Sequence, residues 1–481
     1  MSELALAKDS LNAIVSCPGR RHEDESIPAR TLLSSYYRCP KGLLGSLLAS
    51  GPLSEDKGYF RFGGGTAYGR LAAGNTVPSP GRDMQDVLDQ VIVGNHDVRL
   101  PFDAPEIVEN LLRERYTAHF REEGRMWNEL LRKAYYMVRP YLGVPIRRTI
   151  QKAYLRGWNN IAFPSWPVDT TVENIHKRLL ALLLKAMGLR QLPFIWFWPD
   201  GYSNCLIMTH DVEDSSGKEF CSKLMDMDEA AGLRSSFQIV PEDRYPVSQN
   251  FLASITNRGF EVNVHDLKHD GRLYAEHCEF LRRAARVNEY IKEFGAEGFR
   301  SGILYRNADW YDAFEFSYDM SIPNVAHLDP QRGGCCTVLP YFIGNIVELP
   351  LTCTQDYTLF HILNDYSLEL WKRQVSLISC NYGLVSFVVH PDYIIAPQAR
   401  RTYEALLNYL SELHAAGQTW HALPREVAAW WRERAQMELV PKGEAWQVEG
   451  PGKGRARVAY ASLSGDSVTY SFEADEIPSG N

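Results

Sequence analysis

The sequence predicts an α/β fold whose central part is a distorted (β/α) barrel. The first observation is a set of short apolar runs that end abruptly in polar residues, as Cys205–Met208 ends at Thr209. Such runs are typical of strands buried on both faces. The second is that these runs alternate with helical patterns after residue 214, with short connections, which is typical of parallel sheets. Catalytic groups collect at the carboxyl ends of parallel strands, so these polar residues are the candidate site.

The predicted barrel elements follow one another in chain order. Strands are expected at 236–240 and 259–265, then up to Arg300 and over 385–390, and helices at about 217–231, 247–257, 274–294, 401–416 and 424–437. The two last helices should close the barrel, with Trp430 and Trp431 packing on it. Residues 309–356 are less regular and are predicted to form loops over the barrel mouth.

Three carboxylates follow the run Cys205–Met208 within a few residues. Asp211, Glu213 and Asp214 stand beside His210. Carboxylates at a strand end suit a catalytic site. They also suit an acidic turn that begins the next helix, because acidic residues are common there. This segment alone leaves both readings open.

A histidine pair ends the strand expected over 259–265. His265 and His269 are four residues apart, so on a helical turn they lie on one face and both imidazoles reach one metal ion. Two neutral imidazoles and one carboxylate leave coordination positions open, which suits a catalytic site better than a closed structural one.

The region resembles the polysaccharide deacetylases, the carbohydrate esterase family 4 fold that includes chitooligosaccharide deacetylases. The first signature of that family, usually T-F-D-D-G, is matched by Thr209–Asp214. The resemblance implies that Asp211 is the general base. The usual ligand position holds Val212, so the carboxylate ligand moves to Glu213 or Asp214, with Glu213 favoured because Asp211 and Glu213 point the same way in an extended strand.

The later signatures occur in the family's order. His265 and His269 match its H-S/T-x-x-H spacing, with Asp266 where a hydroxyl residue is usual. In Gly298–Gly302, Arg300 matches the arginine that pairs with the catalytic aspartate.

The last matching signature is Val385–Pro391, a buried strand that ends in a histidine. The resemblance implies that His390 is the general acid that protonates the leaving amine. Asp356 stands where the family often supplies a carboxylate that orients this histidine. The matching part of the chain covers roughly residues 200 to 435.

The resemblance implies a metal-dependent hydrolase that removes an acetyl or other N-acyl group from a sugar or glycan precursor. A divalent metal, with zinc as the expected ion, would serve as cofactor. Two alternatives stay open: a metal-independent amidohydrolase on a small C–N substrate, favoured by Val212, and a non-catalytic glycan-binding protein. The joint presence of five ionisable residues argues against the latter, because sugar binding does not require them: Asp211, His265, His269, Arg300 and His390.

Composition excludes several classes of protein. The 481 residues are 45% hydrophobic and 23% charged with a net charge of -8, typical of a globular chain of two or three domains without a general nucleic-acid footprint. Nine scattered cysteines, including Cys335 and Cys336, favour reduced thiols in the cytoplasm. The N-terminus has no basic region followed by an apolar core. A cytoplasmic deacetylase is expected to act on nucleotide-linked or lipid-linked glycan precursors.

Residues 1–200 are predicted to form a mostly helical region of unassigned role. A helix after the N-cap Asp103 and a second over 172–187 are indicated by apolar periodicity. The glycine triplet 63–65 is expected to be a loop, not a phosphate cradle, and 191–201 a connector into the barrel.

A basic, aromatic segment lies within this region. Residues 127–156 have helical periodicity, and the basic part, 139–156, contains Arg139, Arg147, Arg148, Lys152 and Arg156. Basic residues among aromatics suit peripheral contact with an anionic membrane or a phosphate-bearing substrate. They also suit a solvated face packed beside the acidic barrel.

The chain is expected to end in a small β appendage. Residues 457–472 alternate on both sides of Ser464–Asp466, as in a hairpin. It is too short for an independent core and should dock on the rest. We therefore divide the chain into an N-terminal region (1–200), the barrel (201–438) and this appendage (439–481).

Overall fold

The structure, a computed structural model, describes residues 29–117, 144–443 and 445–473. At its centre is a nine-stranded sheet in the order β12-β13-β11-β10-β9-β8-β7-β14, with β15 also paired to β7. Every pairing is parallel except β12 with β13. The strands are β7 (Asn204–Val212), β8 (Ser236–Ile239), β9 (Glu261–His265), β10 (Gly298–Arg300), β11 (Tyr318–Asp319), β12 (Tyr341–Ile343), β13 (Ile346–Glu348), β14 (Leu384–Val389) and β15 (Thr419–His421).

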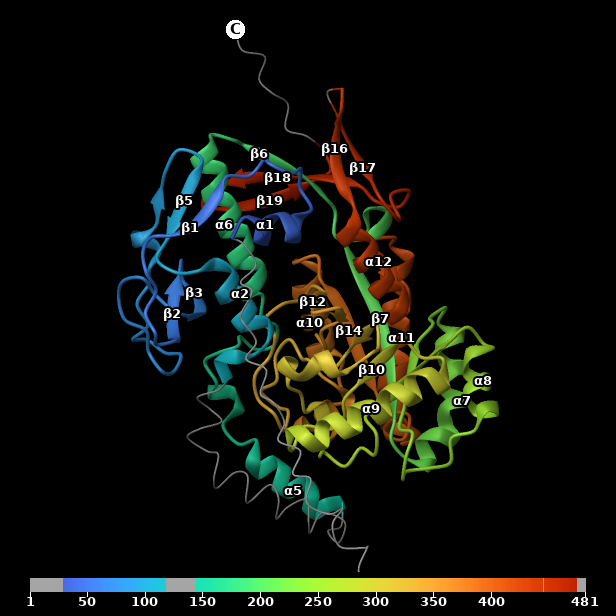
Figure 1. Ribbon diagram of the computed structural model, residues 1–481. Helices are drawn as coiled ribbons and strands as arrows, with labels where there is room; N and C mark the ends of the chain where they lie inside the picture. Colours follow the sequence, from blue (N-terminus) through green and yellow to red (C-terminus); the bar gives the residue numbers. More distant parts are fainter. Residues whose placement is uncertain (1–28, 118–143, 444, 474–481) are drawn as a thin grey trace, which may run out of the picture.

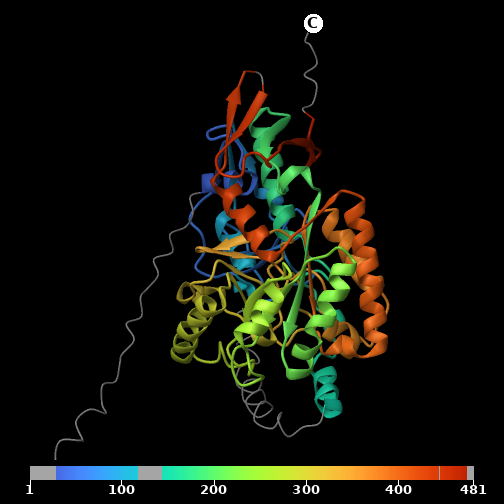
Figure 2. The same ribbon diagram turned by 90° about the vertical axis from the view of Figure 1, so that its right-hand side faces the viewer.

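Helices lie around the outside of this curled sheet (Figures 1 and 2). They are α7 (Ser215–Ala230), α8 (Gln249–Thr256), α9 (His277–Phe294), α10 (Glu369–Ser379), α11 (Pro397–Ala415) and α12 (Pro424–Gln436). The predicted distorted (β/α) barrel is thereby confirmed. Trp430 and Trp431 are buried in the core, as expected.

Strand β7 is longer than its apolar run suggests. All nine of its residues are buried, and its polar residues have internal partners: Thr209 donates to the Phe387 carbonyl at 2.6 Å, and His210 Nε2 lies 3.0 Å from Asp228. The expected end at Thr209 was therefore wrong, because satisfied polar groups can continue a buried strand.

Part of the segment 309–356 also belongs to the sheet. The prediction of loops over the mouth was wrong for β11 and β13, which extend the parallel sheet beyond β10. Strand β11 has two residues and β13 has three. Strands this short give no recognisable pattern in the sequence.

The N-terminal region contains the expected helices and also two small sheets that were not predicted. Its elements are α1 (Ala29–Tyr37), β1 (Ser46–Ala49), β2 (Gly58–Phe62), β3 (Gly65–Gly69), β4 (Ile92–Val93), β5 (Asp97–Leu100), α2 (Ala104–Leu112), α5 (Val144–Tyr154), α6 (Thr171–Met187) and β6 (Gln191–Ile195). Asp103 caps α2 by accepting from the Glu106 amide at 2.8 Å. Of the segment predicted as helical over 127–156, residues 127–143 lie outside the described residues.

The glycine triplet forms the turn between β2 and β3. Gly63 and Gly64 have φ of 61° and 82°, which favours glycine. Their amides donate to the Asp86 carboxylate at 2.9 and 2.7 Å. These amides are therefore bound to a carboxylate of the protein itself, in line with the prediction of a loop and not a phosphate cradle.

The C-terminal appendage docks on the N-terminal region. It consists of β16 (Glu438–Lys442), β17 (Ala445–Glu449), β18 (Val458–Ser464) and β19 (Ser467–Ser471). Strands β18 and β19 form the predicted hairpin, and β18 pairs with β6 in antiparallel register. The expected connector 191–201 was thus wrong in its first half, which forms β6.

Buried polar contacts fix the N-terminal region to the barrel. Arg306 pairs with Glu114 at 2.5 Å, with both side chains buried. Glu173 of α6 accepts from the Thr337 hydroxyl and from the Val338 amide. Among the described residues, no helix combines the length and hydrophobicity that a membrane-spanning segment requires.

We predict that Glu173 makes the folded state less stable as pH rises. Burial raises the pKa of its carboxyl to about 7, above the ordinary value of 4.5. The unfolded chain releases this proton first, so the stabilising contribution is complete below about pH 4.5 and is lost as pH rises towards 7. The wild-type free energy of unfolding should therefore be lower at pH 8 than at pH 4.5, with Glu173 contributing on the order of 1 to 3 kcal/mol of the difference. Glu173→Gln should reduce the difference by this amount.

Denaturant unfolding at both pH values measures the effect. Glu404→Gln, an exposed change on α11, is the control and should keep the wild-type difference. An unchanged difference in Glu173→Gln would show that this carboxyl is ionised in the folded protein.

Candidate active site

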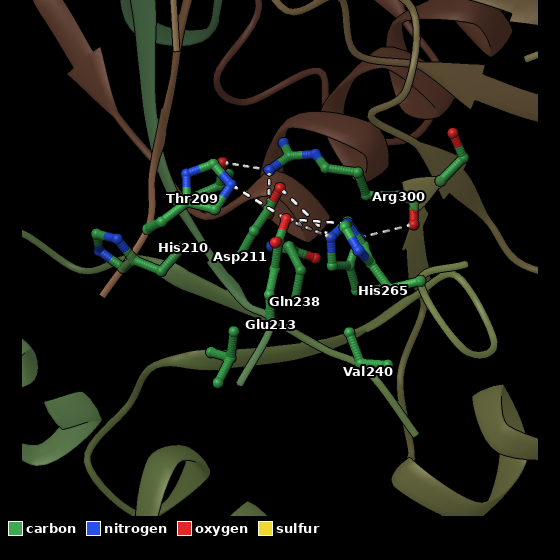
Figure 3. A network of polar contacts seen from close by, with 12 residues as sticks. Thr209, His210, Asp211, Glu213, Gln238, Val240, His265 and Arg300 are labelled. Atoms are coloured by element: carbon green, nitrogen blue, oxygen red, sulfur yellow. Dashed lines mark hydrogen bonds and ion pairs between the residues drawn. The ribbon is translucent and has the colours of Figure 1, made fainter. Parts of the chain in front are cut away.

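A buried ion pair joins the ends of β7 and β10. Arg300 Nη1 donates to Asp211 Oδ1 at 2.6 Å and to Thr209 Oγ1 at 2.8 Å, while Arg300 Nε donates to the Met320 carbonyl at 2.9 Å. Burial raises the pKa of Asp211, but Arg300 and the nearby histidines His265 and His390 lower it more strongly, leaving it below its ordinary value. Asp211 is therefore an ionised carboxylate with one oxygen free of the guanidinium, as Figure 3 shows.

Three donor groups converge beside this pair. The ligand atoms that Glu213, His265 and His269 offer all lie within 4.8 Å of one another. Glu213 Oε1 is 2.9 Å from His269 Nε2 and 3.7 Å from His265 Nε2. Both Nε2 atoms are buried without a well-aligned hydrogen-bond partner. Two imidazoles and one carboxylate that face each other in this way are a donor set for one divalent cation.

The spacing predicted that the two histidines lie on a helical turn, and this was wrong. His265 is the last residue of β9, and the chain leaves it through a loop in which Asp266 and His269 have φ of 54° and 52°. This loop packs closely on the one after β10: a Cβ at Gly302 would lie 2.5 Å from Asp266 Oδ2. The two rings still meet, with centroids 4.9 Å apart, because the loop and not a helix brings them together.

Asp214 lies apart from the cluster. Its carboxylate caps α7, accepting from the Gly217 amide and the Ser216 hydroxyl, both at 2.8 Å. A side chain committed to an N-cap gains its stability from those donors. The structure therefore brings Glu213 to the histidines and gives Asp214 a structural position.

His390, directly after β14, faces the same cluster. Its Nδ1 and its amide both bind Asp356, at 2.6 and 2.7 Å, and its Nε2 lies 3.3 Å from Glu213 Oε1. Burial lowers the pKa of His390, but Asp356 and Glu213 raise it well above its ordinary value. Since Asp356 fixes the Nδ1 proton, Nε2 is the atom that delivers a proton into the site.

The two histidines of the donor set differ in how they are prepared for a cation. His265 Nδ1 lies 3.1 Å from the Arg300 carbonyl, which can only accept, so Nδ1 carries the proton and Nε2 is a free ligand atom. Arg244, which the sequence analysis did not single out, places Nη2 3.1 Å from His269 Nδ1. A guanidinium only donates, so this contact places the His269 proton on Nε2, the nitrogen that faces the other two ligand groups. The donor set fits a cation once this proton moves to Nδ1 and Nε2 becomes free to bind.

Arg244 could not be found from the sequence. It follows Glu242 and Asp243 in a loop after β8, without a motif. Its guanidinium also donates to the carbonyls of Lys268 and His269, at 3.2 and 2.7 Å. It is therefore tied to the loop that carries His269, and those two bonds do not depend on the His269 tautomer.

The chain was compared with known proteins. No family model and no curated protein matches it. Among solved structures, a Mycobacterium smegmatis protein provisionally named a polysaccharide deacetylase is 18% identical with a TM-score of 0.40, over 50% of this chain and 93% of that one.

Two further similar structures cover about the same share of this chain. Puue allantoinase is 12% identical, with a TM-score of 0.39 over 49% of this chain and 92% of that one. The family 4 carbohydrate esterase from Streptomyces lividans, solved with acetate, is 13% identical, with a TM-score of 0.30 over 46% and 93%.

We predict that Glu213, and not Asp214, supports cation binding. Glu213→Gln should weaken the affinity for Zn²⁺ on the order of 10- to 100-fold or more, because even partners of ligands contribute that much. Asp214→Asn keeps a good N-cap residue and should leave the affinity unchanged, whereas Asp214→Ala should cost about 1 kcal/mol of stability. Calorimetric titration with Zn²⁺ and denaturant unfolding measure the two effects. Weaker binding in Asp214→Asn alone would reverse the assignment.

We also predict that Arg244 restrains cation binding. Arg244→Met removes a positive charge and the donor that holds the unfavourable His269 tautomer. The affinity for Zn²⁺ should rise on the order of 10-fold, the scale of effects of second-layer partners. Arg286→Met, which removes an exposed guanidinium on α9, is the matched control. Equal affinities in the two variants would show that Arg244 does not restrain cation binding.

Proposed function

We propose that the chain is a hydrolase that removes an acetyl group from the nitrogen of a sugar or glycan precursor. The observation that carries this proposal is the pairing of an ionised carboxylate, Asp211, with a protonated imidazole, His390, on neighbouring strands. The ordered signatures in the sequence support the same function. In this proposal residues 201–438 perform the chemistry, and residues 1–200 and 439–481 support it.

Asp211 is the general base. Its carboxylate is ionised and oriented by Arg300, and its second oxygen, Oδ2, lies 3.7 Å from His265 Nε2. It therefore accepts a proton from a water molecule bound beside the histidines, and that water attacks the acetamide carbonyl carbon. A positioned base of this kind typically contributes 10²- to 10⁴-fold to the rate.

His390 is the general acid. The carbon–nitrogen bond breaks when His390 Nε2 gives its proton to the sugar nitrogen, so acetate and the free amine leave. Asp356 keeps the imidazole in this orientation through Nδ1. The arrangement separates base and acid into two side chains with opposite pKa displacements, a pattern typical of acid–base catalysis.

Glu213, His265 and His269 would hold the cofactor, a divalent cation for which zinc is our proposal. When bound, such a cation polarises a carbonyl oxygen and lowers the pKa of water. The three residues themselves contribute a carboxylate charge and two imidazole nitrogens at the end of the barrel, where the substrate amide must enter.

A cavity inside the barrel is a candidate position for the acyl group. Its lining includes the apolar residues Leu304, Leu351 and Val388 and the polar residue Gln355. Val388 is two residues before His390 on β14, and Gln355 precedes Asp356. His390 and Asp356 do not line this cavity themselves, so its assignment to the acyl group rests on their nearness along the chain. For a cytoplasmic enzyme the sugar would be nucleotide-linked or lipid-linked.

A metal-independent amidohydrolase acting on a small C–N substrate is the second candidate. The contact of Arg244 with His269 favours it, because that contact keeps a proton on the nitrogen that a cation requires. In this alternative Asp211 still removes the proton of water, and the His390 proton still reaches the leaving nitrogen. Val212, in place of the usual carboxylate, also favours this alternative.

Acetate release from a panel of nucleotide-linked and lipid-linked N-acetylated sugars tests the proposal. Asp211→Asn and His390→Gln should each lower kcat by at least about 10²-fold, because each removes a proton-transfer group. Asp226→Asn, an exposed acidic residue of α7, is the control. Turnover close to wild type in either variant would contradict the assigned roles. Turnover that survives complete removal of divalent cations would favour the metal-independent alternative.

A further inference from the structure

Helix α5 exposes a row of apolar side chains. Ile146, Ile150 and Tyr154 are 54%, 41% and 53% exposed. They are four residues apart, so they follow one face of the helix. Leu155 is buried on another side. Three large exposed apolar residues in register on one short helix are unusual for a surface that faces only water.

The same segment contains basic residues and no acidic residue that could neutralise them. Residues 144–160 contain Arg147, Arg148, Lys152 and Arg156 and no acidic residue, in a chain whose net charge is -8. Lys152 and Arg156 are exposed and form no ion pair within the described part of the chain. Arg332, also exposed, places its guanidinium 5.9 Å from the centre of the Tyr154 ring. Apolar residues flanked by cations are typical of interfacial helices.

Helix α5 lies at the mouth of the candidate site. Figures 1 and 2 both show it at the end of the molecule where β7 finishes. The Tyr357 hydroxyl donates to Gln151 of α5, and the Tyr357 ring lies 5.6 Å from Tyr393, whose ring lies 4.7 Å from His390. The helix is thus connected to the proposed general acid through two aromatic side chains.

We propose that α5 is an interfacial helix that docks the mouth of the active site on an anionic membrane surface. The apolar row enters the boundary between headgroups and acyl chains, and the exposed Lys152 and Arg156 face anionic headgroups. The partner is lipid because three side chains are too few for a stable protein interface, which buries about 800 Å² per partner. An interfacial helix needs only shallow burial.

This proposal builds on the proposed function, because it indicates a lipid-linked form of the acylated sugar. A headgroup that projects from the bilayer would reach His390 at the end of the barrel without leaving the surface. Each basic residue near an anionic surface strengthens binding on the order of fivefold. The attraction weakens with salt, since the charges are exposed.

Sedimentation of the full-length chain with vesicles, in the absence of substrate, tests the docking. Vesicles of phosphatidylcholine alone are compared with vesicles containing about one third phosphatidylglycerol, a typical anionic surface. We expect binding to the anionic vesicles, weaker at high salt, and at least about a 10-fold loss in the double variant Ile146→Ser/Ile150→Ser. Ile92→Ser/Val93→Ser removes two equally exposed aliphatic residues from β4 and should bind like wild type.

Two results would overturn the docking: equal binding to neutral and anionic vesicles, or an equal loss in the α5 and β4 variants. Thermal unfolding confirms that the exposed substitutions leave the fold intact. Acetate release from a soluble substrate should be unchanged in Ile146→Ser/Ile150→Ser. A chain that binds anionic vesicles but releases no acetate supports the docking and contradicts the proposed function, so the two failures are distinguishable.

Discussion

The architecture of the site depends on one buried ion pair, Arg300 with Asp211. Removing two charges from water is costly, and a buried pair persists only when its remaining donors are also bound. Arg300 meets most of this requirement by donating through Nε to the Met320 carbonyl and through Nη1 to the Thr209 hydroxyl and Asp211, while its Nη2 is buried without a hydrogen-bond partner among the described residues. Loss of either partner would leave an unpaired buried charge, which typically costs 3–5 kcal/mol. The pair therefore fixes the ends of β7 and β10 and the ionised state of Asp211 at the same time.

The second half of the site has the opposite electrostatic arrangement. His390 is surrounded by carboxylates, Asp356 behind it and Glu213 in front, so it keeps its proton. Asp211 faces the Arg300 guanidinium and the imidazoles of His265 and His390, and these outweigh burial and the nearby Glu213, so it releases its proton. Glu213 connects the halves because its Oε1 approaches His269 and His390 together. A site with one ionised base and one protonated acid thus results from which charge each buried group faces.

Much of this was predictable, because apolar runs ending in polar residues identify parallel strands. The runs placed Asp211, His265, Arg300 and His390 at strand ends, and the structure gathers them. The sequence could not show the positive φ angles that bring the histidines together, since His265 and His269 have a spacing that also fits a helix. Nor could it show β11, β13 or the N-terminal sheets, whose strands are too short or irregular for a period. Arg244 acts through tertiary contact alone, so no local pattern reveals it.

The N-terminal region has a physical reason to remain attached to the barrel. The central sheet curls, but in the described chain no strand pairing joins β14 to β12, so the barrel is open along that side. Glu173 of α6 binds Thr337 and Val338, and the Val338 carbonyl in turn accepts from the Leu384 amide at the start of β14. The barrel's own chain bridges this side, because Thr352 and Cys353, just after β13, also bond to Leu384 and Ser386 of β14. Glu173 therefore holds one of the bridging segments from outside and fixes α6 to the barrel. Because α5 precedes α6 in the same region, the stretch of chain that is anchored here also carries the amphipathic helix towards the mouth of the site.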